Sequence, residues 1–444
     1  MAVPRFGTDG IRGVANVELT PELVLALGRA AARVLGTDRF VVGRDPRASG
    51  PLLQAALSAG LAAEGAAVVD LGVLPTPGVA FGSARLGAHA AMVSASHNPF
   101  SDNGVKLFAA GGHKLDDATE AAVEAELQAV LIGSADRPGA PVGDITGDLG
   151  VAAAYADHLR CSLEGRRLEG LRVVLDCANG AASAVAPAVF AALGAEVTVI
   201  ADRPDGTNIN RDCGSTYPET LAAAVVAGGA DAGLAFDGDA DRVLAVDVTG
   251  ALVDGDQMLG LLALDRLASG WLAGGTVVAT VMANLGLRRS MAAAGIAVHE
   301  TPVGDRHVLA ALHAGGWSLG GEQSGHLIFP ELATTGDGLL TGLQVLDVMA
   351  RSGRSLGDLA AAAMTRLPQV LRNVVVAGRA AEVAAAVAPT VEAAQAELGD
   401  DGRVLVRASG TEPLVRVMVE AVTAQKADEV AARLVAAVER VAGW

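Results

Sequence analysis

The chain alternates short apolar runs rich in β-branched residues with longer alanine-rich stretches, and this alternation occurs three times. Each copy has a strand-like run, a polar loop, an alanine-rich stretch and a second strand-like run. The paired runs are 40–45 and 67–70, 171–176 and 197–200, and 276–279 and 296–299. Gly65, Gly194 and Gly295 close the three alanine-rich stretches, and glycine is favoured just past a helix C-terminus. The pattern predicts three βαβ units with mostly parallel sheets.

A different pattern follows Leu367-Pro368. Residues 403–407 and 414–420 alternate apolar and polar side chains with the period of two that is typical of strands. The next stretch places apolar residues on one face of a predicted helix, namely Val430, Leu434, Val438 and Val441. This part of the chain is therefore predicted to form a small α+β domain.

The predicted fold class is α/β, with three similar domains built on mixed or parallel sheets in series and a C-terminal α+β domain. The wide spacing of the three copies excludes a solenoid. The predicted domains span residues 1–148, 149–249, 250–366 and 367–444. The uncharged stretch 267–287 is about long enough to cross a bilayer. Glycines and a β-branched run interrupt it, so it is predicted as a helix end, a turn, a strand and a loop, with no membrane span.

The composition and the absence of certain motifs argue against several classes of function. The 444 residues carry a formal net charge of −17 and only 3% aromatic residues, which argues against a nucleic-acid-binding surface. The three cysteines cannot all pair, and no signal-peptide core precedes residue 10, so a reduced, cytoplasmic protein is predicted. The chain contains no GxxxxGK[ST], GxGxxG or HExxH motif, which argues against P-loop hydrolysis and dinucleotide redox chemistry.

A short polar stretch, 94–99, follows the apolar run 90–93 and contains Ser96 and His97. Small polar residues and a proline force a turn there, which exposes a serine hydroxyl on rigid backbone. One interpretation is a Ser/Asn turn that has no catalytic role. The hypothesis favoured here is that Ser96 carries a phosphoryl group, because other stretches supply what a phosphoserine needs.

An acidic loop, Asp237-Gly238-Asp239-Ala240-Asp241-Arg242, follows another apolar run. Three carboxylates at alternate positions can converge on one hard cation. An EF-hand is excluded because Arg242 stands at its glycine position and Val248 at its closing glutamate position. An open oxygen site of this kind suits Mg²⁺ that completes its shell with a phosphate oxygen. The alternative is a solvated acidic turn, in which the three charges would repel one another.

Two further loops carry candidate binding residues. The turn between the strands 403–407 and 414–420 offers hydroxyls, backbone amides and arginines for a phosphate dianion; its candidates are Arg407, Ser409, Gly410, Thr411 and Arg416. The alternative is a hairpin turn with a surface arginine. A glycine-rich loop presents Glu322, Ser324 and His326, which suit vicinal sugar hydroxyls or form an ordinary polar loop. The glycine-rich turn 6–13 contains one cation, Arg12.

Taken together, the four motifs SASHNP (94–99), DGDADR (237–242), GEQSGH (321–326) and RASGTEP (407–413) resemble those of the α-D-phosphohexomutases, in the same order. The stretch FGTDGIRG, residues 208–216 and Gln323 are similar to the bacterial phosphoglucosamine mutases within that superfamily. Tyr217 and Ser101 depart from the pattern at positions where His and Tyr are common. The resemblance implies four domains that enclose a central cleft.

The resemblance also implies a reaction. It predicts interconversion of glucosamine 6-phosphate and glucosamine 1-phosphate through a phosphoserine and a 1,6-bisphosphate, supplying UDP-N-acetylglucosamine and cell-wall precursors. It predicts a hexosamine phosphate substrate and one Mg²⁺ per chain, and it allows a homodimer. Alternatives are a phosphomannomutase/phosphoglucomutase, a Mg²⁺-dependent sugar phosphatase and a non-catalytic sensor.

Residue roles follow from the same resemblance. The predicted metal ligands are Asp237, Asp239, Asp241 and an oxygen of phosphorylated Ser96. His97 and Arg242 are expected to neutralise the transferred group without binding the ion. Lys106 is the candidate general acid/base, with Arg12 nearby; its alternative is a plain surface lysine. The loop at 407–416 is expected to hold the phosphate that is not reacting.

Overall fold

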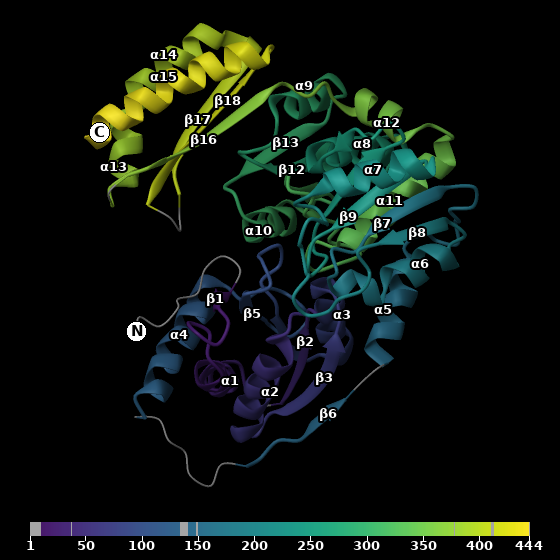
Figure 1. Cartoon of the computed structure of the whole chain (residues 1–444), viewed down its shortest axis with the longest axis vertical. Coiled ribbons are helices and arrows are strands. Elements are labelled where there is room, and N and C mark those ends of the chain that lie inside the picture. Colours follow the sequence, from purple (N-terminus) through teal and green to yellow (C-terminus); the bar gives the residue numbers. More distant parts are fainter. Residues whose placement is uncertain are drawn as a thin grey trace. The chain divides into compact units, whose positions relative to one another are not determined.

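The computed structural model describes residues 10–36, 38–133, 141–147, 150–376, 378–409 and 413–443. The chain divides into two compact units (Figure 1). Unit 1 comprises Met1–Met282 and Ile296–Ala362, and unit 2 comprises Ala283–Gly295 and Ala363–Trp444.

The three predicted βαβ repeats are present. Their elements are β2 (Arg39–Arg44), α2 (Gly50–Ala63) and β3 (Ala67–Val73); β7 (Arg172–Asp176), α6 (Ala186–Ala192) and β8 (Glu196–Ile200); and β12 (Thr276–Thr280), α9 (Leu285–Ala293) and β13 (Ala297–Thr301). The two strands of each repeat pair in parallel. Gly65, Gly194 and Gly295 have φ of 95°, 97° and 74°, so each ends its helix in the left-handed region that glycine adopts freely.

Two more strands extend each repeat in the same way. They are β4 (His89–Val93) and β5 (Asp102–Phe108), β9 (Ala232–Phe236) and β10 (Val243–Asp247), and β14 (Gly320–Gly321) and β15 (Leu327–Ile328). The shared orders are β3-β2-β4-β5, β8-β7-β9-β10 and β13-β12-β14-β15. The third strand of each set is parallel to the central strand and the fourth is antiparallel to the third. These mixed sheets confirm the predicted fold class.

This common order gives three loops the same topological place. The loop 94–101 joins β4 to β5, the loop 237–242 joins β9 to β10, and the loop 322–326 joins β14 to β15. Each loop therefore follows the carboxyl end of the third strand of its sheet. Three of the four predicted motifs lie in these three loops.

Additional strands extend two of the sheets. They are β1 (Ile11–Val14) and β6 (Ile145–Gly147) at the edges of the first sheet and β11 (Leu252–Val253) at an edge of the second. The predicted domain limit at 249/250 thus falls in the turn between β10 and β11. Residues 134–140, between α4 and β6, lie outside the described residues.

Besides α2 and α6, further helices belong to unit 1. They are α1 (Pro21–Leu35), α3 (Thr76–Leu86), α4 (Asp117–Leu131), α5 (Gly150–Cys161), α7 (Pro218–Gly228), α8 (Gly255–Ala268), α10 (Asp305–Gly315), α11 (Gly338–Ser352) and α12 (Leu356–Ala363, whose last residue belongs to unit 2). Two short 3₁₀ turns are η1 (Ala181–Ala184) and η2 (Ala273–Gly275). α1, α2 and α4 share one buried cluster of hydrophobic side chains with the first sheet. None of the helices that the structure describes has the length and apolarity needed to cross a bilayer.

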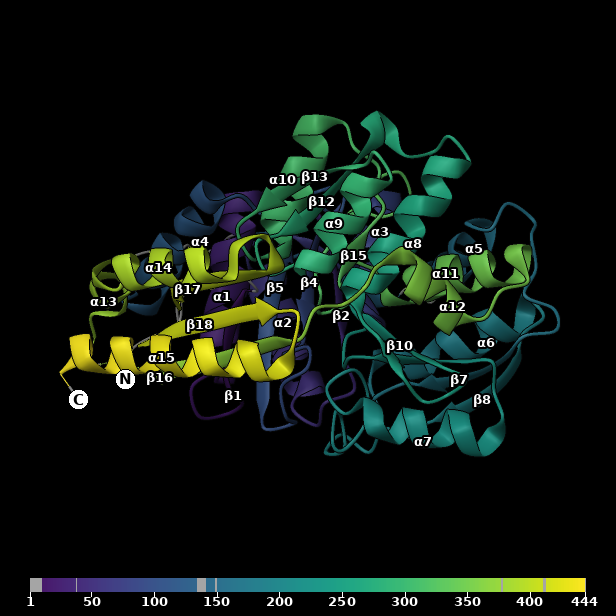
Figure 2. The same cartoon turned by 90° about the horizontal axis from the view of Figure 1, so that it is seen from above.

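Unit 2 is the predicted α+β domain. Its antiparallel sheet has the order β16-β18-β17, from β16 (Gln369–Val375), β18 (Leu414–Ala421) and β17 (Gly402–Ala408). α13 (Ala380–Ala386), α14 (Ala388–Leu398) and α15 (Ala424–Ala442) share a core with this sheet (Figure 2). Val430, Leu434 and Val438 are buried as predicted. Val441 is 47% exposed because it lies in the last turn of α15.

Unit 2 also holds α9, which the repeat pattern assigns to the third βαβ unit. The Asn284 side chain caps α9 and exchanges hydrogen bonds with the backbone of Leu367. A Cβ on Gly286 would lie 2.0 Å from the carbonyl oxygen of Thr365, so only glycine fits there.

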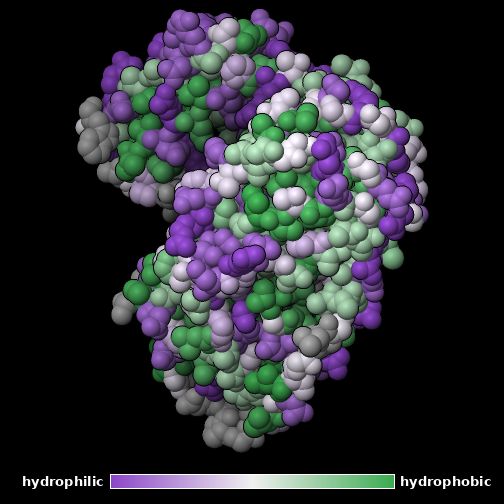
Figure 3. Space-filling view, turned by 45° about the vertical axis from the view of Figure 1, so that its right-hand side comes forward, coloured by the Kyte–Doolittle hydropathy of each residue, from purple (hydrophilic) through white to green (hydrophobic). Residues whose placement is uncertain are grey.

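On the face drawn in Figure 3, hydrophilic and hydrophobic residues alternate in small patches, which is ordinary for a globular surface.

Candidate active site

Ser96 lies at the centre of the candidate site. It follows β4, is 1% exposed and has φ of 53°, a left-handed conformation that is uncommon for a residue other than glycine. Its Oγ donates a hydrogen bond of 2.6 Å to Oδ2 of Asp237. The structure therefore brings the predicted phosphorylation site directly against the first residue of the acidic loop.

The acidic loop is a cluster rather than a solvated turn. Asp237, Asp239 and Asp241 are all buried, and one carboxylate oxygen from each lies within 4.8 Å of the others. Oδ1 of Asp239 and Oδ1 of Asp241 are buried without a hydrogen-bond partner among the described residues. Such oxygens are costly unless a cation or donor meets them. The donor set, carboxylate oxygens only, fits a hard divalent cation such as Mg²⁺.

The protonation tendencies of the cluster differ between its members. Burial and the neighbouring charges of Asp241 and Asp239 raise the pKa of Asp237 well above its usual range. Burial would also raise the pKa of Asp239, but the Lys106 ammonium and the hydrogen bonds from Lys106 and Thr76 outweigh it and lower that pKa. A bound cation would act on Asp237 in the same direction as Lys106 acts on Asp239.

Helix N-termini hold the backbone of the acidic loop. The amide N–H groups of Ala181, Thr76 and Gly338 donate to the carbonyl oxygens of residues 238, 239 and 240, at 2.9, 2.9 and 3.0 Å. These donors come from the first residues of η1, α3 and α11. The loop carbonyls are thereby satisfied by the three helices, and the conformation that gathers the carboxylates is fixed.

Lys106 joins this cluster from β5. It is 3% exposed, and its Nζ lies 2.8 Å from Oδ2 of Asp239 and 3.3 Å from Oδ2 of Asp241. It is therefore not a surface lysine. Arg12, on β1, stands opposite Gly104 on the same sheet, and its charge acts on both His97 and Asp239.

His97 and Arg242 flank Ser96. Nδ1 of His97 lies 3.2 Å from Ser96 Oγ and 3.3 Å from Nη1 of Arg242. Burial, followed by the charges of Arg242 and Arg12, lowers the pKa of His97 to about 4, so its ring is neutral at pH 7. This differs from the expectation that His97 neutralises the transferred group: a neutral His97 can serve as a hydrogen-bonding group, and the positive charge beside Ser96 comes from arginine and lysine.

The loop 322–326 lies against the end of the acidic loop. The amide N–H of Val243 donates to the carbonyl oxygen of Gly325 at 3.1 Å, and a Cβ on Gly325 would lie 1.9 Å from the carbonyl oxygen of Val243. Ser324 is exposed and Glu322 half-buried, whereas His326 is only 2% exposed. His326 Nε2 lies 3.4 Å from Oδ2 of Asp305.

In unit 2, Arg407 and Arg416 lie directly opposite each other on β17 and β18. Burial and the charge of Arg416 lower the pKa of Arg407, and Arg407 Nε is buried without a hydrogen-bond partner among the described residues. Like charges at directly opposite positions are unfavourable unless an anion lies between them. Ser409 follows in the same hairpin, while Gly410 and Thr411 lie outside the described residues.

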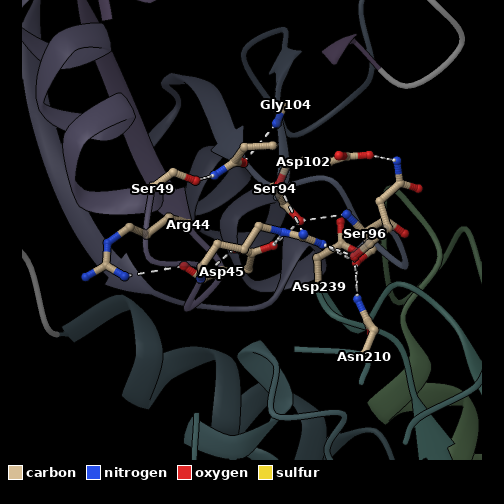
Figure 4. A network of polar contacts seen from close by, with 12 residues as sticks. Arg44, Asp45, Ser49, Ser94, Ser96, Asp102, Gly104, Asn210 and Asp239 are labelled. Carbon is tan, nitrogen blue, oxygen red and sulfur yellow. Dashed lines mark hydrogen bonds and ion pairs between the residues drawn. The ribbon is translucent and has the colours of Figure 1, made fainter. Parts of the chain in front are cut away.

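A buried hydrogen-bond network behind Ser96 was not predicted from the sequence motifs. Arg47 and Asp45, from the segment after β2, reach the loop 94–101. Asn210, from the segment between β8 and α7, reaches it too, and Figure 4 shows Asp45 and Asn210 beside Ser94 and Ser96. A charged Asp-x-Arg at the carboxyl end of a buried strand was the available signal for the first two. Asn210 lies in the stretch 208–216 that resembles the phosphoglucosamine mutases, but its contacts could not be predicted, because its partners are backbone carbonyls more than a hundred residues away.

The comparison with family models covers nearly the whole chain. Residues 4–131, 153–250 and 254–367 match alpha/beta/alpha domains I, II and III of phosphoglucomutase/phosphomannomutase, and residues 371–437 match its C-terminal domain. The fold and the matches together define the class: a four-domain sugar-phosphate mutase. The predicted resemblance to this superfamily is confirmed.

The curated relatives show which group of mutases within this class the chain belongs to. The chain is 54% identical over 441 residues to the phosphoglucosamine mutase of Rhodococcus jostii, covering 96% of this chain and 98% of that one. It is 56% identical over 438 residues to the phosphoglucosamine mutase of Saccharopolyspora erythraea, covering 97% of each. The chain belongs to the phosphoglucosamine mutases.

Solved structures agree at the level of the fold. A phosphoglucomutase/phosphomannomutase family protein from Burkholderia thailandensis is 26% identical with a TM-score of 0.81, covering 98% of this chain and 97% of that one. N-acetylphosphoglucosamine mutase from Aspergillus fumigatus, in complex with GlcNAc-6P and magnesium, is 21% identical with a TM-score of 0.72, covering 99% and 96%.

Proposed function

We propose that this isomerase interconverts glucosamine 6-phosphate and glucosamine 1-phosphate, with Ser96 as the residue that stores the phosphoryl group. The observation that carries the proposal is the 2.6 Å hydrogen bond between Ser96 Oγ and Asp237 within a buried carboxylate cluster. The names of the relatives support the choice of glucosamine phosphate as substrate.

The reaction consists of two phosphoryl transfers. In the first, the O1 hydroxyl of glucosamine 6-phosphate attacks phosphorus on Ser96, an O1–P bond forms and the P–Oγ bond breaks. The proton of O1 passes to a base, and Ser96 Oγ receives a proton. The resulting 1,6-bisphosphate turns round, and Ser96 Oγ attacks the 6-phosphoryl group as the reverse of the first step. The result is glucosamine 1-phosphate and a regenerated phosphoserine.

Asp237, Asp239 and Asp241, with an oxygen of the phosphorylated Ser96, would hold one Mg²⁺. The ion supplies charge neutralisation at the transferred phosphoryl group, which is what phosphoryl transfer chiefly needs. Arg242 contributes from its place beside Asp237, to whose Oδ1 its own amide N–H donates at 3.3 Å.

Other residues handle protons and the substrate. Lys106 moves the proton, with Arg12 beside it, and His97 orients the Ser96 oxygen. Glu322, Ser324 and His326 form the sugar loop, in which the buried His326 supports the loop and the other two contact hydroxyls. Arg407, Ser409, Gly410, Thr411 and Arg416 hold the phosphate that is not being transferred. One clamp serves both orientations because both ends of the bisphosphate carry the same group.

We also propose the domain limits 1–148, 149–249, 250–366 and 367–444 and a cytoplasmic location. The three cysteines, Cys161, Cys177 and Cys213, are free thiols, which suits a reducing compartment. The family resemblance also allows a homodimer, and sedimentation of the purified protein tests it.

The test is a panel of glucosamine, glucose and mannose 6-phosphates, assayed for 1-phosphate formation and for free phosphate with wild type and Ser96→Ala. The proposal expects isomerisation that is fastest with glucosamine 6-phosphate and abolished in the variant. Preference for mannose or glucose phosphate would make the protein a phosphomannomutase/phosphoglucomutase. Free phosphate without isomerisation would make it a phosphatase, and turnover by Ser96→Ala would remove the covalent step.

A further inference from the structure

Arg47 is a fully buried arginine just after β2, and its side chain reaches the loop that carries Ser96. Its Nε donates to Oδ2 of Asp45 at 2.9 Å. Its two Nη atoms donate to three backbone carbonyl oxygens of the loop, those of Ser96 at 2.9 Å, Asn98 at 2.8 Å and Pro99, and to that of Asp102, the first residue of β5, at 3.1 Å. All five donors of the guanidinium are thus used: three hold the loop, one holds the start of β5 and one binds Asp45.

Asp45 completes the arrangement from the other side of Ser96. Its Oδ2 accepts a hydrogen bond of 2.6 Å from Ser94 Oγ, and Ser94 Oγ in turn accepts one of 2.9 Å from the amide N–H of Ser96. The N–H of Ser96 is therefore tied to Asp45 through Ser94, and its C=O is tied to Arg47. One buried ion pair holds both ends of the residue that carries the hydroxyl.

Asn210, from the second predicted domain, binds two of the same carbonyl oxygens. Nδ2 of Asn210 donates to Ser96 O at 2.9 Å and to Asn98 O at 3.1 Å. Asn210 is 6% exposed and has φ of 57°. Gly238 packs close by, since a Cβ there would lie 2.4 Å from Ser96 O. Donors from two domains therefore converge on two peptide groups.

These contacts explain how Ser96 keeps its left-handed conformation. A residue other than glycine at φ of 53° stays there only when its surroundings impose it. Because the peptide bond is planar and trans, holding the carbonyl of Ser96 against Arg47 and Asn210 turns the N–H of His97 to the opposite side. The direction of the Ser96 side chain is set at the same time, and it points at Asp237.

We propose that Arg47 and Asn210 are positioning residues for phosphoryl transfer: they clamp the carbonyl oxygens of Ser96 and Asn98 and so hold Ser96 Oγ in line with the acidic cluster. This inference rests on the proposed function. Neither residue touches the reacting atoms, and both act through the backbone of the loop.

The first test compares Arg47→Lys with Arg33→Lys. Lysine keeps the charge but not the planar fork, so it cannot hold four carbonyl oxygens. Arg33 is the matched control, because its side chain is 2% exposed, close to the 0% of Arg47, and it binds Glu64 and Glu126 of the same domain away from the loop. The expected result is a similar change in melting temperature for both, with kcat lowered roughly 10- to 100-fold only in Arg47→Lys and KM within about twofold.

The second test uses Asn210→Gly, which removes the donor while glycine accepts the positive φ without strain. It is expected to lower kcat with unchanged KM and to slow transfer of the phosphoryl group from Ser96 in a single turnover followed by intact mass. The double variant with Arg47→Lys is expected to lose less than the product of the single losses, because both residues act on the same two carbonyl oxygens.

The outcomes separate the two proposals. If wild type fails to isomerise any of the sugar phosphates, the proposed function is wrong. If wild type isomerises and Arg47→Lys matches Arg33→Lys in kcat, the positioning role is wrong. If Arg47→Lys does not fold, Asn210→Gly decides: an unchanged transfer rate from Ser96 overturns the role, and a slowed rate supports it.

Discussion

At the scale of single residues, Asp239 divides its two carboxylate oxygens between different tasks. Oδ2 accepts hydrogen bonds from Thr76 Oγ1 at 2.6 Å and from Lys106 at 2.8 Å. Oδ1 is buried without a hydrogen-bond partner among the described residues. One oxygen thus fixes the side chain, and the other is left without a donor and is available to a cation.

Asp239→Asn is expected to raise the Mg²⁺ concentration for half-maximal activity by roughly 10- to 100-fold, since an amide oxygen replaces an anionic ligand. The measurement is a Mg²⁺ titration of mutase activity. Glu219→Gln, an exposed change on α7, serves as the control and should leave the titration unchanged. Equal curves for wild type and Asp239→Asn would show that the acidic loop is not the metal site.

Arg407→Met is expected to have opposite effects on stability and binding. Relieving the repulsion from Arg416 should stabilise the substrate-free protein by roughly 0.2–1 kcal/mol. Loss of a charge-assisted hydrogen bond to phosphate should raise KM about 10- to 100-fold. Urea unfolding and steady-state kinetics measure the two effects, with the exposed Arg372→Met of the same sheet as control. An unchanged KM would count against the phosphate clamp.

The sequence predicted the acidic triplet and Ser96 because each contrasts with the apolar strand before it. The structure brings these residues together, and their catalytic roles stay predictions. The sequence did not reveal Arg47 or Asn210, because their partners are carbonyl oxygens, which every residue has. Nor could it show that Lys106 is buried against Asp239, since that contact depends on how two domains pack.

At the scale of elements, the repeated strand order explains why the site is built from loops of different domains. The loops 94–101, 237–242 and 322–326 all leave the third strand of a sheet and enter the antiparallel fourth. Helix N-termini then fix the middle loop, and α11 does so through its first residue, Gly338. Its amide N–H donates to the carbonyl oxygen of Ala240 at 3.0 Å.

Gly338→Ala tests this support of the acidic loop. A Cβ at Gly338 would lie 2.4 Å from the carbonyl oxygen of Arg242, so α11 or the loop must move. The expected result is weaker Mg²⁺ activation, by about 10-fold or more, together with a lower melting temperature. Gly228→Ala is the control, because a Cβ there meets no atom within 4 Å. Normal Mg²⁺ activation in Gly338→Ala would contradict the role of α11.

Asp337, the N-cap of α11, gives a pH-dependent prediction. Burial raises its pKa to about 6, against hydrogen bonds from Leu340 and Tyr155 that act to lower it. The folded protein therefore holds this proton up to about pH 6, whereas the unfolded chain releases it near pH 4. Between these values the contribution of Asp337 to stability falls as pH rises, by about 3 kcal/mol in total.

Asp337→Asn removes this titration and keeps a capping side chain. The free energy of unfolding of the variant, relative to wild type, should increase from pH 4 to pH 7. Urea unfolding at several pH values measures it. A difference between the two proteins that does not change with pH would show that Asp337 ionises normally in the folded state.

At the scale of the whole molecule, periodicity alone predicted three βαβ repeats and a C-terminal α+β domain. It succeeded because in each repeat a buried, β-branched strand is followed along the chain by a helix that a glycine closes. It could not show that α9 packs with unit 2, because that choice depends on the fit of Gly286 against Thr365. The domain limits stay a prediction, and the limit at 249/250 lies in a turn within one sheet.

The most direct measurement follows the phosphoryl group on Ser96 through one turnover. Phosphorylated protein is mixed with glucosamine 6-phosphate and Mg²⁺, quenched at short times and analysed by mass for the Ser96 peptide and for the bisphosphate. The account predicts that Ser96 loses its phosphoryl group as the bisphosphate forms and regains it as glucosamine 1-phosphate is released. Isomerisation while the phosphoryl group stays on Ser96 throughout would contradict it.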